Sequence, residues 1–535
     1  MEKGKSIKII DIQPREIDPF TKGSSSDSEE EFNYRGDPTY IVQLFGIDEK
    51  RNTYSVFVEG FTPYFYIKVD AIKGGFKVAM FDEWLTKKLG ETYAAGIEDI
   101  TIEKHKKLYG FDAGTRHCFI KISFSNMDAY HKTKNLWYNI VTKPYKKSLK
   151  KYHKNKQKYT GLHITELGIV AELYEAHIPP MLRFLHIQKL SPSGWVVLKK
   201  DSYTSIEGED KITTCKYEYK IDSVNINPEP GKEDRVPYKI CSFDIEASSS
   251  HGDFPLAEKN YKKLAFNMIE YIESHEIEEM EDILTKMIFT AFGFINDMDV
   301  DIERVYPKRG VKKNILEGQI YKWLNNQILK IKGVEGEIYD NDNEEDTIEM
   351  YYTTKKQRDL DFKSKTIVTI LESTTLSREH RIIALMNSLD EYFPELEGDK
   401  VTFIGSTFIN YGETEPYLNH CICLDTCSNI PNAKIESYKT EREVLLNWTK
   451  LIQKEDPDIV IGYNIFGFDF SFMFKRAVQL DCVEEFLDLS RNKDEVCGMY
   501  NEKRGKWEIE KKTTVLASGE HTLEYIGMKG RLLID

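Results

Sequence analysis

The chain has 535 residues, a formal net charge of −14, eight cysteines, and a composition of 40% hydrophobic and 30% charged residues. This length predicts about three or four soluble globular domains with more than one core. The negative charge argues against indiscriminate coating of DNA, and it requires a local basic path if nucleic acid is bound. Scattered cysteines indicate reduced thiols in an intracellular compartment. No long apolar run and no signal-peptide core occur, which excludes a membrane-spanning or secreted protein.

The N-terminal residues combine a short apolar stretch with an acidic, serine-rich tract, Ser24 to Glu31, for which we expect a solvated loop. Residues 39–70 alternate apolar and polar around turn signals, which predicts an antiparallel meander. Between residues 143 and 159, eight lysines are interleaved with three tyrosines. That pattern suits contact with a phosphate backbone and stacked bases, and it equally suits a solvated basic surface.

Two carboxylates lie next to one another near the middle of the chain. The run Tyr238 to Ile245 follows a proline and predicts a buried strand. Side chains two apart on a strand share a face, so Asp244 and Glu246 point together. Their repulsion would be relieved by a shared divalent cation, Mg²⁺ or Mn²⁺. The alternative is a solvated strand end, since an Asp-x-Glu triplet is common.

A third carboxylate follows a second predicted strand. Ile459 to Gly462 is a short apolar run, and Phe468 to Leu480 has helical spacing. Asp469 falls in the first turn of that helix, at the carboxyl end of the strand, where open α/β sheets place ligands. Three converging carboxylates are what two-metal phosphodiester hydrolysis requires. One ion lowers the pKa of the attacking water, and both stabilise the attacking and leaving oxygens.

The two segments resemble, in order, the first and second exonuclease motifs of family B DNA polymerases, as Phe243-Asp-Ile-Glu246 and Gly462-Tyr-Asn-x₃-Phe-Asp469. Gly60-Phe-Thr-Pro-Tyr-Phe-Tyr66 is also similar to the polymerase delta group. The resemblance implies an α/β fold, α+β overall, in which a β-rich N-terminal domain precedes a ribonuclease-H-like exonuclease domain. The implied division is a segment 1–38, a domain 39–235 and an exonuclease domain 236–535, with an insertion at about 258–398.

In function, the resemblance implies the N-terminal and 3′–5′ proofreading exonuclease region of a replicative DNA-directed DNA polymerase. The abundance of Lys, Ile, Asn and Tyr is similar to that of polymerases from large DNA viruses. By motif matching, Asp244, Glu246 and Asp469 would ligate two Mg²⁺ or Mn²⁺ ions. Asn464 would hold the site by hydrogen bonding, and Phe468 would pack beside the terminal nucleotide. The implied partners are a single-stranded DNA 3′ end at a primer-template, the rest of the polymerase and a sliding clamp. The implied location is the nucleus or a viral replication site.

The family also has a third exonuclease motif, Tyr-x₃-Asp, which the C-terminal stretch does not offer, and palm motifs, which are not present in the sequence. We therefore expect no DNA synthesis by this chain and at most trace hydrolysis. One alternative is a non-catalytic module that binds single-stranded DNA or polymerase partners and has an incomplete exonuclease site. Another is a stand-alone exonuclease. A zinc site at His420, Cys421, Cys423 and Cys427 is disfavoured because no second ligand pair with suitable spacing follows.

Overall fold

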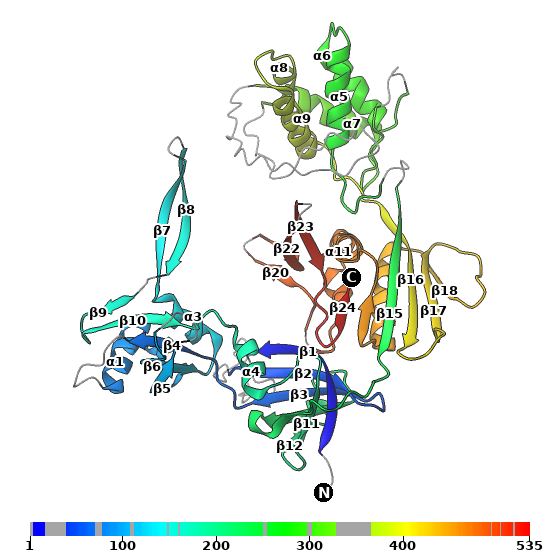
Figure 1. Cartoon of the computed structure of the whole chain (residues 1–535). Coiled ribbons are helices and arrows are strands. Elements are labelled where there is room, and N and C mark those ends of the chain that lie inside the picture. Colours follow the sequence, from blue (N-terminus) through cyan, green and yellow to red (C-terminus); the bar gives the residue numbers. More distant parts are fainter. Residues whose placement is uncertain are drawn as a thin grey trace, which may run out of the picture.

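The computed structural model describes most of the chain: residues 4–16, 39–69, 77–107, 112–146, 149–158, 161–249, 254–296, 302–327, 365–493, 495–502, 504–516 and 519–535. These residues form three larger β-sheets, three two-stranded ribbons and a group of helices between two strands (Figure 1). The fold class is α/β, α+β for the whole chain, with a β-rich N-terminal half, as predicted. Among the described helices, none is long and apolar enough to cross a membrane. The predicted acidic loop, Ser24 to Glu31, lies outside the described residues.

The first sheet contains the start of the described chain. Its strand order is β12-β13-β3-β2-β1-β11-β14. The bounds are β1 Lys5–Arg15, β2 Ile41–Ile47, β3 Thr53–Glu59, β11 Trp195–Leu198, β12 Tyr203–Ser205, β13 Tyr217–Asp222 and β14 Ile226–Pro228. Every residue of β2 is buried. One face of the sheet packs against helix α4 (Pro180–Gln188) through Phe184 and Leu185. The short 3₁₀ helices η1 (Gly208–Asp210) and η2 (Ser223–Asn225) lie in its connections.

The strands of the second sheet lie in the chain between β3 and β11 of the first sheet. The order of the second sheet is β5-β6-β4-β10-β9, with β4 Tyr64–Val69, β5 Ile97–Lys106, β6 Arg116–Phe124, β9 Leu162–Ile164 and β10 Ile169–Tyr174. Helices α1 (Val78–Leu89), α2 (Glu91–Ala94) and α3 (Met127–Asn135) accompany it. Between β6 and β9, strands β7 (Tyr138–Lys146) and β8 (Leu149–Lys158) pair antiparallel. The side chains of the lysine- and tyrosine-rich stretch lie outside the description, so its contact with nucleic acid stays a prediction.

The third sheet contains the predicted carboxylate motifs. Its order is β18-β17-β16-β15-β19-β24, with bounds β15 Lys239–Ser248, β16 Lys400–Asn410, β17 Leu418–Leu424, β18 Lys434–Tyr438, β19 Ile459–Ile461 and β24 Leu532–Ile534. Strand β15 pairs antiparallel with β16 and parallel with β19. Helices α10 (Glu441–Glu455), α11 (Asp469–Gln479) and α12 (Val483–Phe486) follow the strands. Helix α10 starts with a capping box between Thr440 and Glu443, which fixes its first residue.

Two further ribbons precede β24. Strands β20 (Met499–Asn501) and β21 (Lys506–Glu508) form one, and β22 (Glu510–Leu516) and β23 (Gly519–Tyr525) form the other. The β22–β23 ribbon contacts α11 through a hydrogen bond from Ser471 Oγ to Glu524 Oε2 of 2.5 Å. This contact places the end of β23 beside the helix that begins with Asp469.

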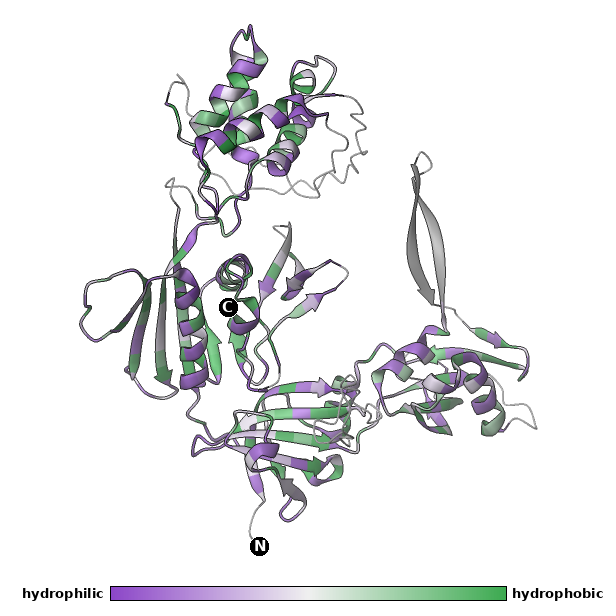
Figure 2. Ribbon diagram, turned by 180° about the vertical axis from the view of Figure 1, so that it is seen from behind, coloured by the Kyte–Doolittle hydropathy of each residue, from purple (hydrophilic) through white to green (hydrophobic). Residues whose placement is uncertain are grey.

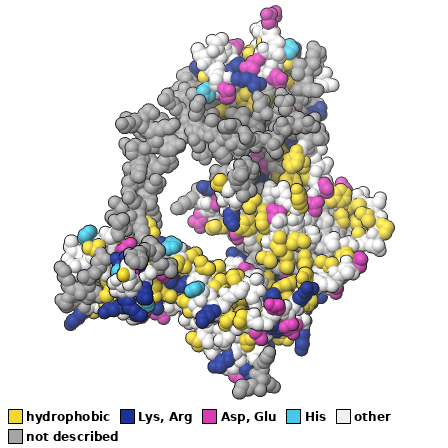
Figure 3. Space-filling view, viewed as in Figure 1, with side chains coloured by type: hydrophobic (Ala, Val, Ile, Leu, Met, Phe, Trp, Pro, Cys, Tyr) yellow, Lys and Arg dark blue, Asp and Glu magenta, His cyan; other side chains and the backbone are white. Residues whose placement is uncertain are grey.

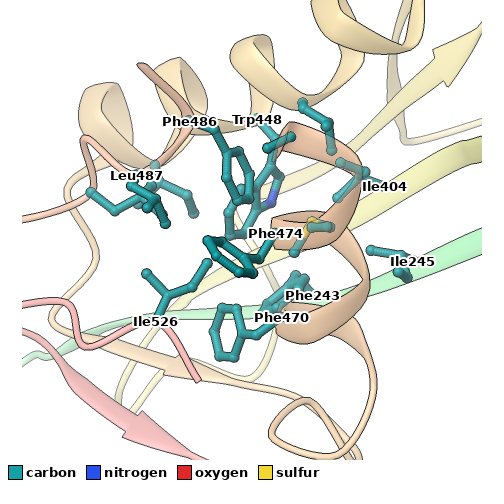
Figure 4. Packing of buried hydrophobic residues seen from close by; sticks show 14 of the residues in the cluster. Phe243, Ile245, Ile404, Trp448, Phe470, Phe474, Phe486, Leu487 and Ile526 are labelled. Carbon is teal, nitrogen blue, oxygen red and sulfur yellow. The ribbon is translucent and has the colours of Figure 1, made fainter. Parts of the chain in front are cut away.

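One buried cluster fills the space between the third sheet and its helices (Figure 4). The ring centroid of Phe243 lies 4.9 Å from that of Trp448 and 5.3 Å from that of Phe470. Since Trp448 belongs to α10 and Phe470 to α11, both helices cover the same face of β15. Each aromatic contact of this kind contributes roughly 0.5–1.5 kcal/mol beyond the area that it buries. In Figure 2, the strands of the sheets carry both hydrophobic (green) and hydrophilic (purple) residues.

The helices between β15 and β16 have a core of their own. They are α5 (Lys262–Ser274), α6 (Met280–Ala291), α7 (Lys313–Asn325), α8 (Ile367–Leu371) and α9 (Arg378–Tyr392). Trp323 is fully buried among them, and its Nε1 donates a 2.9 Å hydrogen bond to Ser388 Oγ. Their buried residues form a cluster separate from the one under the third sheet. The domain boundaries inferred from the sequence, including the insertion at about 258–398, remain a proposal.

The two chain segments that connect this helical group to the sheet touch one another. The Asp399 N–H donates a 2.8 Å hydrogen bond to the Leu256 carbonyl, and Asp399 Oδ2 accepts one of 2.9 Å from the Leu256 N–H. A Cβ placed on Gly398 would lie 1.8 Å from the Ala257 carbonyl oxygen. Arg476 of α11 donates to the same carbonyl oxygen at 3.4 Å. The connection therefore closes just beyond the ends of the neighbouring strands β15 and β16.

A buried ion-pair network lies where the first and third sheets meet. Arg491 donates from Nε to Asp456 at 3.0 Å and from Nη2 to Asp458 at 2.8 Å. Burial alone would raise the pKa of Asp456, but Arg491 and Arg531 outweigh it and hold that pKa below its usual range. The next residue, Asn492, accepts a 2.9 Å hydrogen bond from Gln43 of β2. The network therefore stabilises both the end of α10 and the contact between the two sheets.

We expect the helical group to be dispensable for folding of the third sheet. Replacing residues 258–397 with a short Gly/Ser linker closes a gap whose ends, Ala257 and Gly398, already touch. Because the free energy of loop closure changes slowly with loop length, the sheet should lose no more than about 1–2 kcal/mol. Thermal unfolding followed by near-UV circular dichroism measures this. Loss of a cooperative transition in the shortened chain would show that the helices are part of the sheet's core.

We expect Arg491→Leu to lower the free energy of unfolding by about 3–5 kcal/mol, because it leaves Asp458 buried without its cation and removes one of the two arginines that pair with Asp456. Denaturant unfolding measures the change. The matched control is Arg504→Ala, which breaks an exposed pair with Glu508 and should cost less than about 0.5 kcal/mol. Equal effects of the two substitutions would contradict the role given to the buried network.

Candidate active site

Strand β15 presents the first two predicted carboxylates to solvent. Cys241, Phe243 and Ile245 are buried, whereas Asp244 and Glu246 are exposed on the opposite face. The alternation follows from the period of two along a strand, as predicted. Pairing with β16 fixes the register, because Asp244 lies opposite Gly405. The face that both carboxylates share is therefore the one that α10 and α11 do not cover.

Glycine at position 405 leaves room beside Asp244. A Cβ added there would meet no atom within 4 Å. A hollow of about 270 Å³ opens at this place, and its lining includes Ser242, Asp244, Gly405, Thr407, Asn419 and Cys421. The lining combines hydroxyl, amide and carboxylate groups with the apolar surface of residues such as Phe243 and Ala433. The wall of the hollow therefore carries a single carboxylate, that of Asp244, among polar and apolar groups.

Asp469, the last residue of the second motif, lies next to β15. It is the first residue of α11, its exposed fraction is 2%, and its Oδ1 accepts a 3.1 Å hydrogen bond from the Ile245 N–H. Strand β19 runs parallel to β15 and ends at Ile461, so the turn that follows β19 returns to the middle of β15. The third carboxylate thus lies beside the peptide that joins the first two.

The charge on Asp469 is disfavoured in its surroundings. Burial raises the pKa of this carboxyl to about 6, the Ile245 N–H opposes that rise, and the charges of Asp244 and Asp535 add to it. A carboxylate that is buried beside two others is stabilised by a cation that neutralises them. The structure therefore brings Asp244 and Asp469 into electrostatic contact, with Asp535 as a further neighbour.

The predicted role of Glu246 as a metal ligand rests only on its position on the strand. Within the described residues, no group of three or more His, Cys, Asp and Glu side chains is arranged to hold a metal ion. Glu246 shares the exposed face of β15 with Asp244, and a register shift in the pairing with β16 follows it directly. Its part in metal binding stays a prediction.

Asn464 and Phe468 lie at the two ends of the turn before Asp469. Asn464 has a φ of 56°, in the left-handed region that asparagine tolerates, and its carbonyl accepts a 2.9 Å hydrogen bond from the Phe468 N–H. A Cβ on Gly467 would lie 2.2 Å from Asn464 Oδ1, so glycine is required for this side chain to fold over the turn. The Phe468 ring packs edge-on against Phe254 at 5.4 Å between centroids.

Two residues beside the predicted site, Phe254 and Asp535, were not predicted as site residues from the sequence. Phe254 is 73% exposed beside Phe468, and its signal was an aromatic residue shortly after the first carboxylate motif. Asp535 follows β24, the strand that pairs parallel with β19. A carboxylate directly after a predicted sheet strand was the available signal. The sequence does not show that β24 pairs with β19, and this pairing is what brings Asp535 to the site.

Comparison with known proteins gives a family. The family model described as DNA polymerase family B, exonuclease domain, matches residues 171–303 and 332–535. The chain is 38% identical to a DNA polymerase of Phaeocystis pouchetii virus over 568 residues, which covers 100% of this chain and 52% of the relative. It is 30% identical to a DNA polymerase of Pyramimonas orientalis virus, with 93% and 38% covered.

A cellular relative is more distant. The chain is 20% identical to the DNA polymerase delta catalytic subunit of Schizosaccharomyces pombe, with 88% of this chain and 28% of the relative covered. The chain therefore spans about half, or less, of the length of these relatives. The family match includes both carboxylate motifs, with strands β15 and β19 and the start of α11. On this match, the chain belongs to DNA polymerase family B, through its exonuclease domain.

Proposed function

We propose that the chain supplies the N-terminal and 3′–5′ proofreading exonuclease region of a replicative DNA-directed DNA polymerase. The observation that supports this most is the hydrogen bond from the Ile245 N–H to Asp469 Oδ1, which joins the two motifs into one carboxylate site. The named relatives are DNA polymerases of viruses and a polymerase delta subunit. A viral or nuclear replication site is the location that this proposal implies.

The chemistry would be metal-dependent hydrolysis of a phosphodiester bond. The residues fit a divalent cation, because Asp469 is a buried carboxyl with a raised pKa beside Asp244. Asp244, Glu246 and Asp469 would hold two Mg²⁺ or Mn²⁺ ions. When bound, the ions supply an activated water and stabilise the charge that develops on the phosphate. The Ile245 N–H orients Asp469, and Asn464 fixes the turn that carries it.

The substrate would be the 3′ end of a single DNA strand. Phe468 and Phe254 form an aromatic pair that is partly exposed beside the carboxylates, and an aromatic face suits stacking of a base. In Figure 3, Lys and Arg side chains gather over the part with the second sheet, which gives the acidic chain a local basic surface. The primer-template, the rest of the polymerase and a sliding clamp are the partners that this proposal includes.

The direct test is hydrolysis of a 5′-labelled single-stranded oligonucleotide. We expect at most slow shortening from the 3′ end by this chain, and that shortening should require Mg²⁺ or Mn²⁺. Asp244→Ala and Asp469→Asn should each lower the rate at least about a hundredfold, because both weaken metal binding and water activation. The control is Asp425→Asn, which changes an exposed carboxylate of the same sheet region and should leave the rate unchanged. Metal binding with no Asp244-dependent hydrolysis would favour the non-catalytic binding module.

The raised pKa of Asp469 predicts how stability depends on pH without metal. The carboxyl titrates near 6 in the folded chain and near its ordinary value of 3.8 when unfolded. Between these values the folded state binds the extra proton, so this group makes the chain more stable as the pH falls from 6 towards 4. At pH 7 the ionised group is destabilising. Asp469→Asn should therefore be more stable there by roughly 1–2 kcal/mol, after a discount for solvent screening.

Chemical unfolding of both chains from pH 4 to 8 in chelator-treated buffer measures this difference. The advantage of the asparagine variant should disappear towards pH 4, and Mn²⁺ should reverse it at pH 7 by stabilising only the wild type. A constant difference between the two chains across this range would rule out the raised pKa.

A further inference from the structure

The turn between β19 and α11 is held by a side chain that none of the sequence motifs includes. Asp535 Oδ1 accepts a 3.1 Å hydrogen bond from the Ile465 N–H, and its Oδ2 accepts one of 3.3 Å from the Phe466 N–H. The two amides are separated from Asp535 by about 70 positions in the chain. The carboxylate therefore closes the turn from outside, as a capping residue closes the end of a helix.

Strand β24 delivers Asp535 to this place. It pairs parallel with β19, with Ile534 opposite Ile461, and the Gly462 N–H donates to the Ile534 carbonyl at 3.4 Å. Parallel strands end at the same edge of a sheet, so the residue after β24 meets the residues after β19. Ile465 is fully buried, which fixes the turn against the core from its other side.

The end of β23 supports the same peptide. The Glu524 N–H donates a 2.9 Å hydrogen bond to the Phe466 carbonyl, and the Tyr525 ring lies 5.0 Å from that of Phe466. The Phe466 residue thus has its N–H on Asp535, its carbonyl on Glu524 and its ring on Tyr525. Its neighbours Asn464 and Phe468 are exposed or half-buried, so the turn depends on these contacts for a single conformation.

We propose that Asp535 is a positioning residue of the exonuclease site: it fixes the turn from Asn464 to Phe468, and through it the placement of Asp469 against β15. This inference rests on the proposed function. Both Asp535 oxygens accept backbone N–H groups of the turn, so the residue acts through the turn and does not touch the reacting atoms. The consequence is that a segment after the second motif controls how well that motif binds metal.

Amide-resolved hydrogen exchange of the metal-free 535-residue chain tests the contact itself. In Asp535→Ala, the amides of Ile465 and Phe466 should exchange about tenfold faster or more, because each loses a hydrogen bond to a charged acceptor. The amides of β15 and β16 should keep their wild-type rates. The control Asp425→Asn, an exposed carboxylate on the exit of β17, should change neither set. Unchanged exchange at both turn amides would overturn the proposal.

The conservative variant Asp535→Asn serves as the second arm and decides the matter if the alanine variant does not fold. Its amide oxygen can still accept from one of the two N–H groups, while its NH₂ cannot accept from the other. One turn amide should therefore remain protected and the other should exchange faster. Two protected amides would contradict the role assigned to the carboxylate.

Titration with Mn²⁺, followed by calorimetry, tests the effect on the site. Asp535→Asn should weaken binding by about three- to tenfold, and Asp244→Ala by at least about tenfold. Faster exchange with unchanged Mn²⁺ affinity would overturn the positioning role, since the turn would then not control the site. Normal exchange with a loss of Mn²⁺ as large as that of Asp244→Ala would make Asp535 a metal ligand instead. If the wild type binds no Mn²⁺, the proposed function fails, whereas the exchange data still decide whether Asp535 holds the turn.

Discussion

The alternation of side chains along β15 is the constraint on which the rest of the exonuclease sheet depends. Phe243 and Ile245 must enter the core, so Asp244 and Glu246 must leave it on the other face. A slip of one residue would bury both carboxylates and expose both hydrophobic side chains. Antiparallel pairing with β16 and parallel pairing with β19 prevent that slip from both sides. The position of the carboxylates is therefore a result of core packing, with Trp448 and Phe470 closing over Phe243.

The same packing places a charge where it is unfavourable. Phe470 is fully buried next to Asp469, so the start of α11 is drawn onto the sheet together with its carboxyl group. Burial then raises the pKa of Asp469, and the Ile245 N–H offsets only part of that effect. A site of this kind has lower stability when empty than when a cation is bound. Stability and the proposed chemistry are thus opposed at one residue, as is common where pKa values are strongly shifted.

The helical group and the first sheet are connected to the exonuclease sheet in two different ways. The helical group enters and leaves at a neck where Leu256 and Asp399 are hydrogen-bonded, and its core around Trp323 is separate. It can therefore be present without changing the register of β15 and β16. The first sheet, in contrast, is joined to the exonuclease sheet through Arg491 and Asn492, where buried polar groups pair with each other. Such contacts are specific, because loss of one partner leaves another buried without its hydrogen bond.

The sequence by itself determined the elements and the faces of the motif strands. A period of two placed Asp244 and Glu246 together, helical spacing predicted α11, and the motif order indicated the family. These signals are local, because each depends on residues that are neighbours in the chain. Only the tertiary structure decided which strands are adjacent. It placed β24 beside β19 and so brought Asp535 to the Ile465 and Phe466 amides. It also gave Asp469 its raised pKa and paired Arg491 with Asp458. These contacts join positions up to 224 residues apart, and they exist because burial in a shared core, and not the local pattern, selects one arrangement of the strands.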